Sequence, residues 1–324
     1  MPRVILETSE GDAVYHCIGR IAGQDHLLGK QEREQFVKML KQQARFSGVE
    51  IVSYCIMANH FHLLLRFKDL SGMSDQELVR RVKGFYRKQS ILRQLVEECF
   101  EKHGKLLPRL RDPLLRRMGN LSIFMQELKG RYTRWYNATH DRKGTLWSER
   151  FRSIVVENAP EVVATVAAYI DLNPVRAAIV EDPKDYRWCS YAEAVAGGKD
   201  ARNGILSFAL SKGWKAAQAE YRERLFVKAG VSGRSDKKAL DREAILEIKR
   251  KGGVLTMAEL LRLRIRYFSD GVALGSEEHV EKVFGKFRMA FGKDRKKGAK
   301  PIRIKSPELK NLKTLRDLQR DATA

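Results

Sequence analysis

Two apolar runs separated by a three-residue break constrain the fold of this chain more than any other segment. Residues 51–56 and 60–67 are rich in β-branched, aromatic and aliphatic side chains, with the polar break 57–59 between them. This pattern predicts a β-hairpin. Because alternate side chains of a strand share a face, one apolar face is expected to contain Phe61, Leu63, Leu65 and Phe67. His60 and His62 then point together to the opposite face, where they are either ordinary strand-end histidines or ligands of one divalent metal.

The charge of the chain limits its partners. The 324 residues include 62 Lys and Arg against 40 Asp and Glu, a formal net charge of +22. Such an excess favours nucleic acid, with an anionic membrane surface as the main competitor. No segment approaches the ~18 apolar residues of a membrane span, and the start has no signal-peptide core. Four scattered cysteines suggest buried thiols in a reducing compartment. We therefore expect a cytoplasmic, polyanion-binding protein without a membrane partner.

The order of predicted elements indicates an α+β fold. Residues 13–20 resemble a first strand, and apolar spacing predicts a helix over 31–46 before the hairpin. A basic, helical stretch follows over 69–120. Residues 122–137 form the next predicted helix, with Ser122 as its N-cap, and 151–156 form a fourth strand. The sequence therefore predicts strand–helix–strand–strand–helix–strand.

A further helix is predicted after the fourth strand, with Asn158 as N-cap and Glu161 as its capping-box partner. Its apolar stripe contains Val163, Val166, Ala167 and Ile170. A second stripe, spaced about one turn apart, contains Thr165, Tyr169, Asn173 and Arg176. Tyr169 and Asn173 are therefore expected to face the same point. Pro174 must kink or restart the helix, and Asn173 could instead serve as the N-cap of the restarted turn.

A second tyrosine pair competes for the role of nucleophile. Tyr132 and Tyr136 have helical i, i+4 spacing in a basic and aromatic context. Tyr132 continues the apolar stripe of Phe124 and Leu128, which predicts a core position. Tyr169 shares its stripe with polar residues, which predicts that it faces a polar site.

Basic residues interleaved with aromatics indicate contacts to a nucleic-acid backbone. One segment holds Phe85 and Tyr86 among Arg80, Arg81, Lys83, Arg87 and Lys88, and further candidates are Arg150, Arg152 and Arg176. A solvated charged helix face is the alternative interpretation.

Several motifs occur together in an order that resembles the REP-associated tyrosine transposases, which are single-tyrosine members of the HUH endonuclease superfamily. These motifs are the Ala-Val-Tyr-His start at residue 13, the His60-Phe61-His62 strand, Gly144-Thr145-Leu146-Trp147 with Arg150-Phe151, and the Tyr169–Arg176 run. The similarity covers about residues 13–195 and ends in the run from Pro183 to Tyr191.

The resemblance implies a ferredoxin-like antiparallel sheet with helices, the HUH endonuclease fold. It implies that His60 and His62 bind Mg²⁺ or Mn²⁺, that Tyr169 is the nucleophile and that Asn173 completes the metal site. At the position of the third ligand this chain has Asn, where related transposases can have Gln. The implied activity is cleavage and rejoining of single-stranded, hairpin-forming DNA through a 5′-phosphotyrosine. Both a monomer and a homodimer remain open.

Two other functions remain open at this stage. A non-catalytic DNA- or RNA-binding regulator could use the same fold, although it has no need for the two histidines and Tyr169. A replication initiator or relaxase is the nearest enzymatic rival, but these often have two tyrosines on the nucleophile helix, where Tyr169 stands alone.

The C-terminal third is expected to lie apart from the site. The domain boundaries that we expect are 1–195 for the transposase domain, 196–232 for a helical extension and linker, 233–292 for a smaller helical domain and 293–324 for a basic tail. The helical domain is predicted to have helices near 241–251, 257–265 and 276–291, the last with Ser276 as N-cap. It either binds DNA or is a plain packing bundle. The tail is expected to be irregular.

Overall fold

The computed structural model describes residues 4–6, 11–24, 26–226, 266–302 and 309–316. Its centre is an antiparallel sheet of β1 (Ala13–Arg20), β2 (Glu50–Ile56), β3 (His60–Phe67) and β4 (Arg152–Val156). The strands have the spatial order β2-β3-β1-β4. Helix α1 (Lys30–Ser47) follows β1, and helix α5 (Leu121–Thr139) precedes β4. This is the split βαβ arrangement of a ferredoxin-like fold. The predicted α+β fold class is confirmed.

The central hairpin forms where the sequence predicted it. Met57 N donates to the His60 carbonyl oxygen (2.8 Å), which closes the turn, and Ile56 pairs with Phe61 in antiparallel register. The predicted apolar face is confirmed, since no member is more than 2% exposed: Phe61, Leu63, Leu65 and Phe67. The other face of β3 carries His62 and Leu64 toward a different layer of helices.

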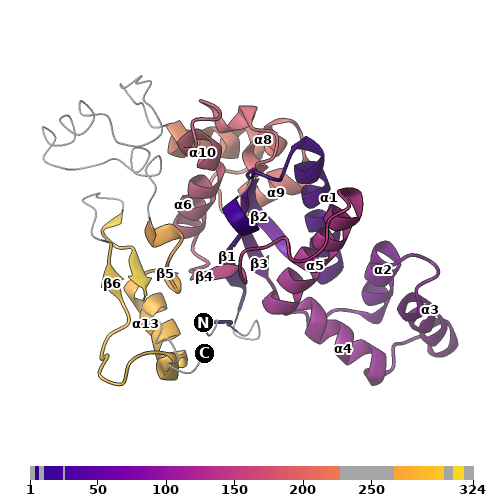
Figure 1. Cartoon of the computed structure of the whole chain (residues 1–324). Helices are drawn as coiled ribbons and strands as arrows, with labels where there is room; N and C mark the ends of the chain where they lie inside the picture. Colours follow the sequence, from indigo (N-terminus) through magenta and orange to yellow (C-terminus); the bar gives the residue numbers. More distant parts are fainter. Residues whose placement is uncertain (1–3, 7–10, 25, 227–265, 303–308, 317–324) are drawn as a thin grey trace, which may run out of the picture.

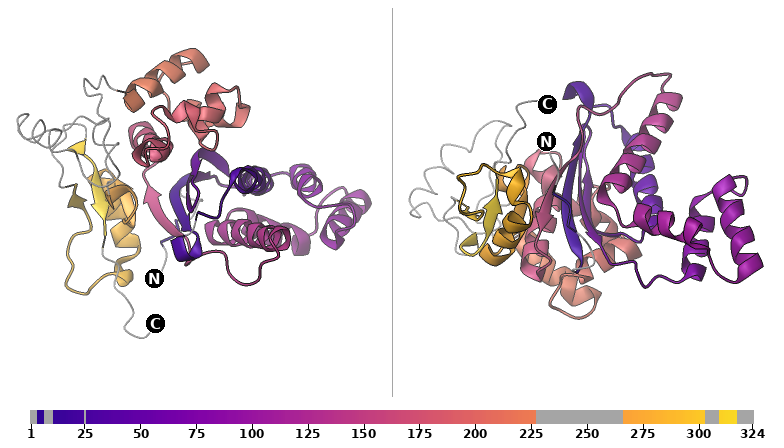
Figure 2. Two further views of the ribbon diagram at one scale, coloured as in Figure 1. Left: turned by 45° about the horizontal axis from the view of Figure 1, so that its top comes forward. Right: turned by 90° about the horizontal axis from the view of Figure 1, so that it is seen from below.

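The sheet lies between two helical layers (Figures 1 and 2). On one face, α1 packs against α5 over a core that includes Tyr15, Phe36 and Phe61. The other face is covered by α6 (Pro160–Asp171), α7 (Asn173–Arg176), α8 (Ser190–Val195), α9 (Lys199–Leu206) and α10 (Trp214–Phe226). Short 3₁₀ turns occupy Ala22–Gln24 and Pro183–Asp185. The nucleophile helix predicted from the sequence is α6, and it therefore packs on the face that carries His62.

The basic stretch between the hairpin and α5 is helical, as predicted. It folds into α2 (Asp75–Phe85), α3 (Ile91–His103) and α4 (Pro108–Met118), which project from the α1/α5 side in Figure 1. These helices share a small apolar core that includes Phe46, Leu78, Val82, Val96, Leu114 and Met118. No helix among the residues that the structure describes is long and apolar enough to cross a membrane.

Two predicted helix caps are wrong. The N-cap of α5 is Asn120, whose side chain accepts from Ile123 N, and Ser122 lies inside the helix. The N-cap of α6 is Ala159, which makes no side-chain cap. Asn158 instead accepts a hydrogen bond from Arg66 Nε (3.1 Å). The Asn158 side chain, which the capping-box pattern assigned to the helix N-terminus, therefore binds the buried Arg66 guanidinium on β3 instead.

The C-terminal region differs from the expected helical domain. The helices expected at 241–251 and 257–265 lie outside the described residues. After a 3₁₀ turn (Arg266–Phe268), β5 (Ala273–Gly275) pairs in parallel with the free edge of β4, and Val155 N donates to the Val272 carbonyl oxygen (2.8 Å). A three-residue strand is too short to show a periodic pattern in the sequence. It becomes a strand because it pairs with the edge of β4.

The rest of this region continues the sheet. Helix α13 (Glu277–Lys286), capped by Ser276 as predicted, and a 3₁₀ turn (Arg288–Ala290) are followed by β6 (Lys300–Pro301) and β7 (Lys313–Leu315). The sheet thus has seven strands in the order β2-β3-β1-β4-β5-β7-β6. Part of the tail expected to be irregular therefore forms strands.

Candidate active site

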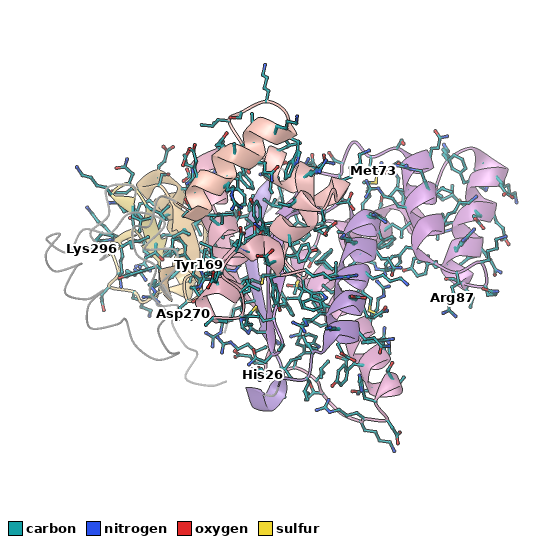
Figure 3. The ribbon with its side chains drawn as sticks, turned by 90° about the horizontal axis from the view of Figure 1, so that it is seen from above. His26, Met73, Arg87, Tyr169, Asp270 and Lys296 are labelled. Carbon is teal, nitrogen blue, oxygen red and sulfur yellow. The ribbon has the colours of Figure 1, made fainter. Side chains whose placement is uncertain are left out.

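A cavity of about 570 Å³ opens where β1, β3 and β4 meet the α6–α7 junction and the turn before β5. It brings together six of the side chains predicted from the sequence: His60, His62, Arg152, Tyr169, Asn173 and Arg176. Its other lining residues are Ile18, Arg20, Met57, Asn59, Ala177, Ser269 and Asp270. Figure 3 shows Tyr169 and Asp270 close together beside the sheet.

The two histidines share a strand face, as predicted, and their ring centroids lie 5.2 Å apart. His60 lies opposite Arg20, and His62 opposite Ile18, in the pairing of β3 with β1. The His60 Nδ1 atom lies 2.7 Å from the Asn59 side-chain oxygen. Because that oxygen can only accept, His60 Nδ1 is the donor of this hydrogen bond.

A third histidine, His16 on β1, orients His62. Its Nδ1 lies 2.8 Å from the Phe268 carbonyl oxygen, and its Nε2 lies 2.9 Å from His62 Nδ1. Burial lowers the pKa of His16 to about 4 and also lowers the pKa of His62, so both rings are neutral at pH 7. The Phe268 carbonyl can only accept, so His16 Nδ1 donates and His16 Nε2 accepts from His62 Nδ1. His62 Nε2 therefore carries the lone pair.

Tyr169 lies near the end of α6 with its ring packed between aromatic and cationic groups. The ring is 3% exposed, and its centroid is 5.1 Å from that of Phe268 and 6.2 Å from that of His62. The Arg176 guanidinium carbon lies 4.0 Å above the same ring. This cation–π contact holds the Tyr169 ring against Arg176 at the cavity.

Asn173 follows Tyr169 by one helical turn across the break between α6 and α7. Its Nδ2 donates to the Ile170 carbonyl oxygen (2.9 Å), and the side chain is buried at the cavity wall. The alternative role as an N-cap is not adopted, since Leu172 occupies the N-cap position of α7 and no side chain caps that turn. The hydrogen bond from Nδ2 holds the amide in one orientation, with Oδ1 as its remaining ligand atom.

The C-terminal region is part of this site, which corrects the expectation that it lies apart. Phe268 contacts both His16 and Tyr169, and Ser269 and Asp270 line the cavity. Asp270 also accepts from Arg152 Nη1 (3.1 Å). The sequence reasoning assigned no role to these residues or to His16. For His16, the available signal was the Ala-Val-Tyr-His start at residue 13.

The other predicted DNA-binding residues lie outside this cavity. Arg80 and Arg81 both pair with Glu77, and Lys83 pairs with Glu97 (3.3 Å). The remaining three side chains are exposed: Arg87, Lys88 and Arg150. Internal partners therefore already hold part of the positive charge in this segment.

The competing tyrosine pair lies on the opposite face of the sheet. The Tyr132 hydroxyl donates to the Glu32 carbonyl oxygen (2.9 Å), and burial raises the pKa of Tyr132. Tyr136 is also buried in that core, as part of the packing between α5 and its neighbours. Neither tyrosine lines the candidate active site.

The fold and cavity define an α+β protein whose sheet presents a histidine pair to a tyrosine on a neighbouring helix. Residues 10–101 match the family described as Transposase IS200-like, which confirms the family resemblance over that segment. This match supports a function as a DNA transposase or endonuclease and suggests a DNA-cleaving enzyme.

Two solved structures are similar to the chain. One is a REP-associated tyrosine transposase bound to a REP hairpin, at 13% identity and a TM-score of 0.39, with 61% of this chain and 86% of that chain covered. The other is a candidate transposase from Deinococcus radiodurans R1, at 15% identity and a TM-score of 0.24, with 48% of this chain and 83% of that chain covered. The comparison with curated proteins found no match.

Proposed function

We propose that this protein is a metal-dependent, single-tyrosine HUH transposase that cleaves and rejoins single-stranded, hairpin-forming DNA. The observation that carries the proposal is the convergence of His60, His62, Tyr169 and Asn173 in one cavity. These residues come from β3 and from the α6–α7 junction of the same chain, so a single chain supplies the whole set. The proposal therefore requires no exchange of helices between subunits.

The donor atoms at the site fit Mg²⁺ or Mn²⁺. The ligands that we propose are His60 Nε2, His62 Nε2 and Asn173 Oδ1, because the hydrogen bonds described above use His60 Nδ1, His62 Nδ1 and Asn173 Nδ2. Among the described residues, no three His, Cys, Asp or Glu side chains gather as a metal site, and the third ligand that we propose is the Asn173 amide. When bound, the ion supplies positive charge that polarises a phosphodiester.

The protein's own side chains account for the rest of the chemistry. Arg20, Arg152 and Arg176 line the cavity and favour an anionic phosphodiester there. The Tyr169 hydroxyl gives up its proton as its oxygen attacks phosphorus, a bond from Tyr169 to phosphorus forms, and the bond from phosphorus to the 3′ oxygen breaks. The departing 3′ oxygen takes up a proton, which leaves a 5′-phosphotyrosine and a free 3′-hydroxyl. Attack by a 3′-hydroxyl reverses these steps, so rejoining needs no nucleotide cofactor.

Single-stranded hairpin DNA is the substrate that we propose. The net charge of +22 favours a polyanion, and the similar REP-associated transposase is described as bound to a REP hairpin. A lone tyrosine at the cavity, with Tyr132 and Tyr136 buried elsewhere, favours this class over an initiator with two nucleophiles.

The test is the covalent adduct. Purified protein with a labelled hairpin oligonucleotide and Mn²⁺ is expected to form an SDS-resistant adduct on Tyr169. Tyr169→Phe removes one hydroxyl, so it is expected to abolish the adduct and to leave hairpin binding within about twofold. Tyr136→Phe is the matched control and should retain the adduct. Peptide mapping that places DNA on any other tyrosine would refute the assignment.

A further inference from the structure

A second, larger cleft lies outside the candidate active site. It has a volume of about 1010 Å³ and is bounded by the α2–α3 connection, α4 and α5. Its lining residues are Phe85, Tyr86, Arg87, Gln89, Ser90, Arg117, Gln126, Glu127, Gly130, Arg131 and Arg134. None of them lines the cavity around Tyr169. Figure 3 shows Arg87 on the outlying helices, away from Tyr169 beside the sheet.

The cleft is strongly cationic. Four guanidinium groups line it, against the single carboxylate of Glu127. That carboxylate is already paired with Arg117 at 2.5 Å. Arg131 donates to the side-chain oxygens of Gln43 (3.0 Å) and Gln42 (3.1 Å), and burial lowers its pKa. The cleft therefore has four guanidinium groups against one carboxylate, and this excess of positive charge favours an anionic ligand.

Aromatic rings fix two of these arginines in place. The Arg131 guanidinium carbon lies 4.5 Å from the centre of the Phe85 ring, and Arg117 lies 4.8 Å from that of Phe46. The other side of Phe85 stacks on Phe46 at 4.3 Å. Because both faces of Phe85 are covered, this ring cannot stack on a base. Phe85 and Phe46 therefore position cations.

The cleft also leaves room for a backbone to approach. Arg87 and Arg134 are exposed at its edges. A Cβ atom added at Gly130 would have only Arg134 Nη1 within 4 Å, at an ordinary contact distance of 3.6 Å. The surface of α5 at Gly130 is thus open to a ligand, and the guanidinium groups of the cleft lie around it.

We propose that this cleft binds the phosphodiester backbone of the DNA substrate at a distance from the active site, without reading the base sequence. The proposal rests on DNA being the substrate. Guanidinium groups match phosphate oxygens, while the covered aromatic faces offer nothing that distinguishes one base from another. The cleft would hold the portion of the DNA that does not enter the cavity around Tyr169.

The experiment compares two double variants of equal charge in a Tyr169→Phe background, where no adduct can form. Arg87→Ala with Arg134→Ala removes the two exposed cations of the cleft. Lys102→Ala with Arg109→Ala is the control, because both residues are exposed on α3 and α4 but lie outside the cleft. The affinity for a hairpin with single-stranded flanks is measured by fluorescence anisotropy across a salt series.

The cleft variant is expected to reduce the slope of log affinity against log salt by about 1.4 to 1.8, since each phosphate contact contributes about 0.7 to 0.9. At 0.15 M salt this corresponds to roughly 10- to 30-fold weaker binding. A hairpin of shuffled sequence should show the same loss. Oligonucleotides with only the stem or only a single strand then identify which part of the DNA occupies the cleft.

A second pair of variants guards against a local folding defect. Gly130→Glu places a carboxylate in the cleft, and Gly285→Glu places one on α13, where an added Cβ meets nothing within 4 Å. Only Gly130→Glu is expected to weaken binding. An unchanged slope in the cleft variants, or an equal loss in the controls, overturns the proposal. Neither result depends on whether Tyr169 forms an adduct, so failure of the catalytic assignment remains distinguishable.

Discussion

Replacement of His16 tests whether the Phe268–His16–His62 hydrogen bonds prepare the metal site. His16→Phe keeps a buried ring but removes the donor to the Phe268 carbonyl and the acceptor for His62 Nδ1. Each buried group left without a partner costs about 1–3 kcal/mol, so the free energy of unfolding should fall by roughly 2–6 kcal/mol. His62 also loses the hydrogen bond that assigns its proton to Nδ1.

The effect on metal binding is expected to exceed the effect on the chemistry itself. Loss of a partner that orients a histidine ligand typically weakens metal binding about 10- to 100-fold, or roughly 1.4–2.8 kcal/mol. The assay is the yield of covalent DNA adduct as a function of Mn²⁺ concentration. The half-maximal Mn²⁺ concentration should rise by that factor, and the plateau should recover at high Mn²⁺.

Two further variants make this result interpretable. His16→Gln can offer an amide oxygen to His62 Nδ1, so it is expected to shift the Mn²⁺ midpoint less than His16→Phe does. His103→Phe changes an exposed histidine on α3 and should shift nothing. A folded His16→Phe protein with an unchanged midpoint, or with a lower plateau at the same midpoint, would refute the reasoning.

Three other predictions follow from the same contacts. His60→Ala should abolish the adduct while hairpin affinity at fixed salt stays within about threefold, because backbone binding depends on Lys and Arg; a larger loss in gel-shift titrations would assign His60 to recognition. Deletion of residues 266–324 removes the Phe268 carbonyl and the strand on β4, so adduct yield should collapse even at high protein concentration, and full yield would contradict this. Burial raises the pKa of Asp171 from 3.8 to about 6. As the pH rises, Asp171 therefore ionises in the unfolded chain before it ionises in the folded chain. The free energy of unfolding should be highest below pH 3.8 and should fall by about 3 kcal/mol as the pH rises to about 6. Urea unfolding should show this loss in the wild type and not in Asp171→Asn, and equal pH profiles would contradict it.

The sequence by itself determined the local elements and the faces of their side chains. Alternation over 60–67 placed His60 and His62 on one face, because successive side chains of a strand must alternate. Helical spacing likewise placed Tyr169 and Asn173 one turn apart and put Tyr132 in the core. These patterns depend only on the chain within a few residues, so they can be recognised before any long-range contact is known.

Hydrogen-bond partners were less predictable, because they depend on what else lies nearby. Asn158 suited an N-cap, but the folded chain places Arg66 beside it. Arg80 and Arg87 look alike in the sequence, yet only Arg80 has Glu77 as a close partner, while Arg87 stands exposed at the cleft. A basic segment therefore does not reveal which of its charges are already paired.

Only the tertiary structure decided how the active site is assembled. His16 contacts His62 across 46 residues of sequence and Phe268 across 252. The C-terminal strand β5 joins the sheet because β4 offers a free edge of backbone donors and acceptors. Neither contact leaves a periodic signal, since each arises when distant segments close on one another. The local sequence therefore indicated His60, His62 and Tyr169 as site residues, whereas long-range tertiary contacts determined which other residues orient and enclose them.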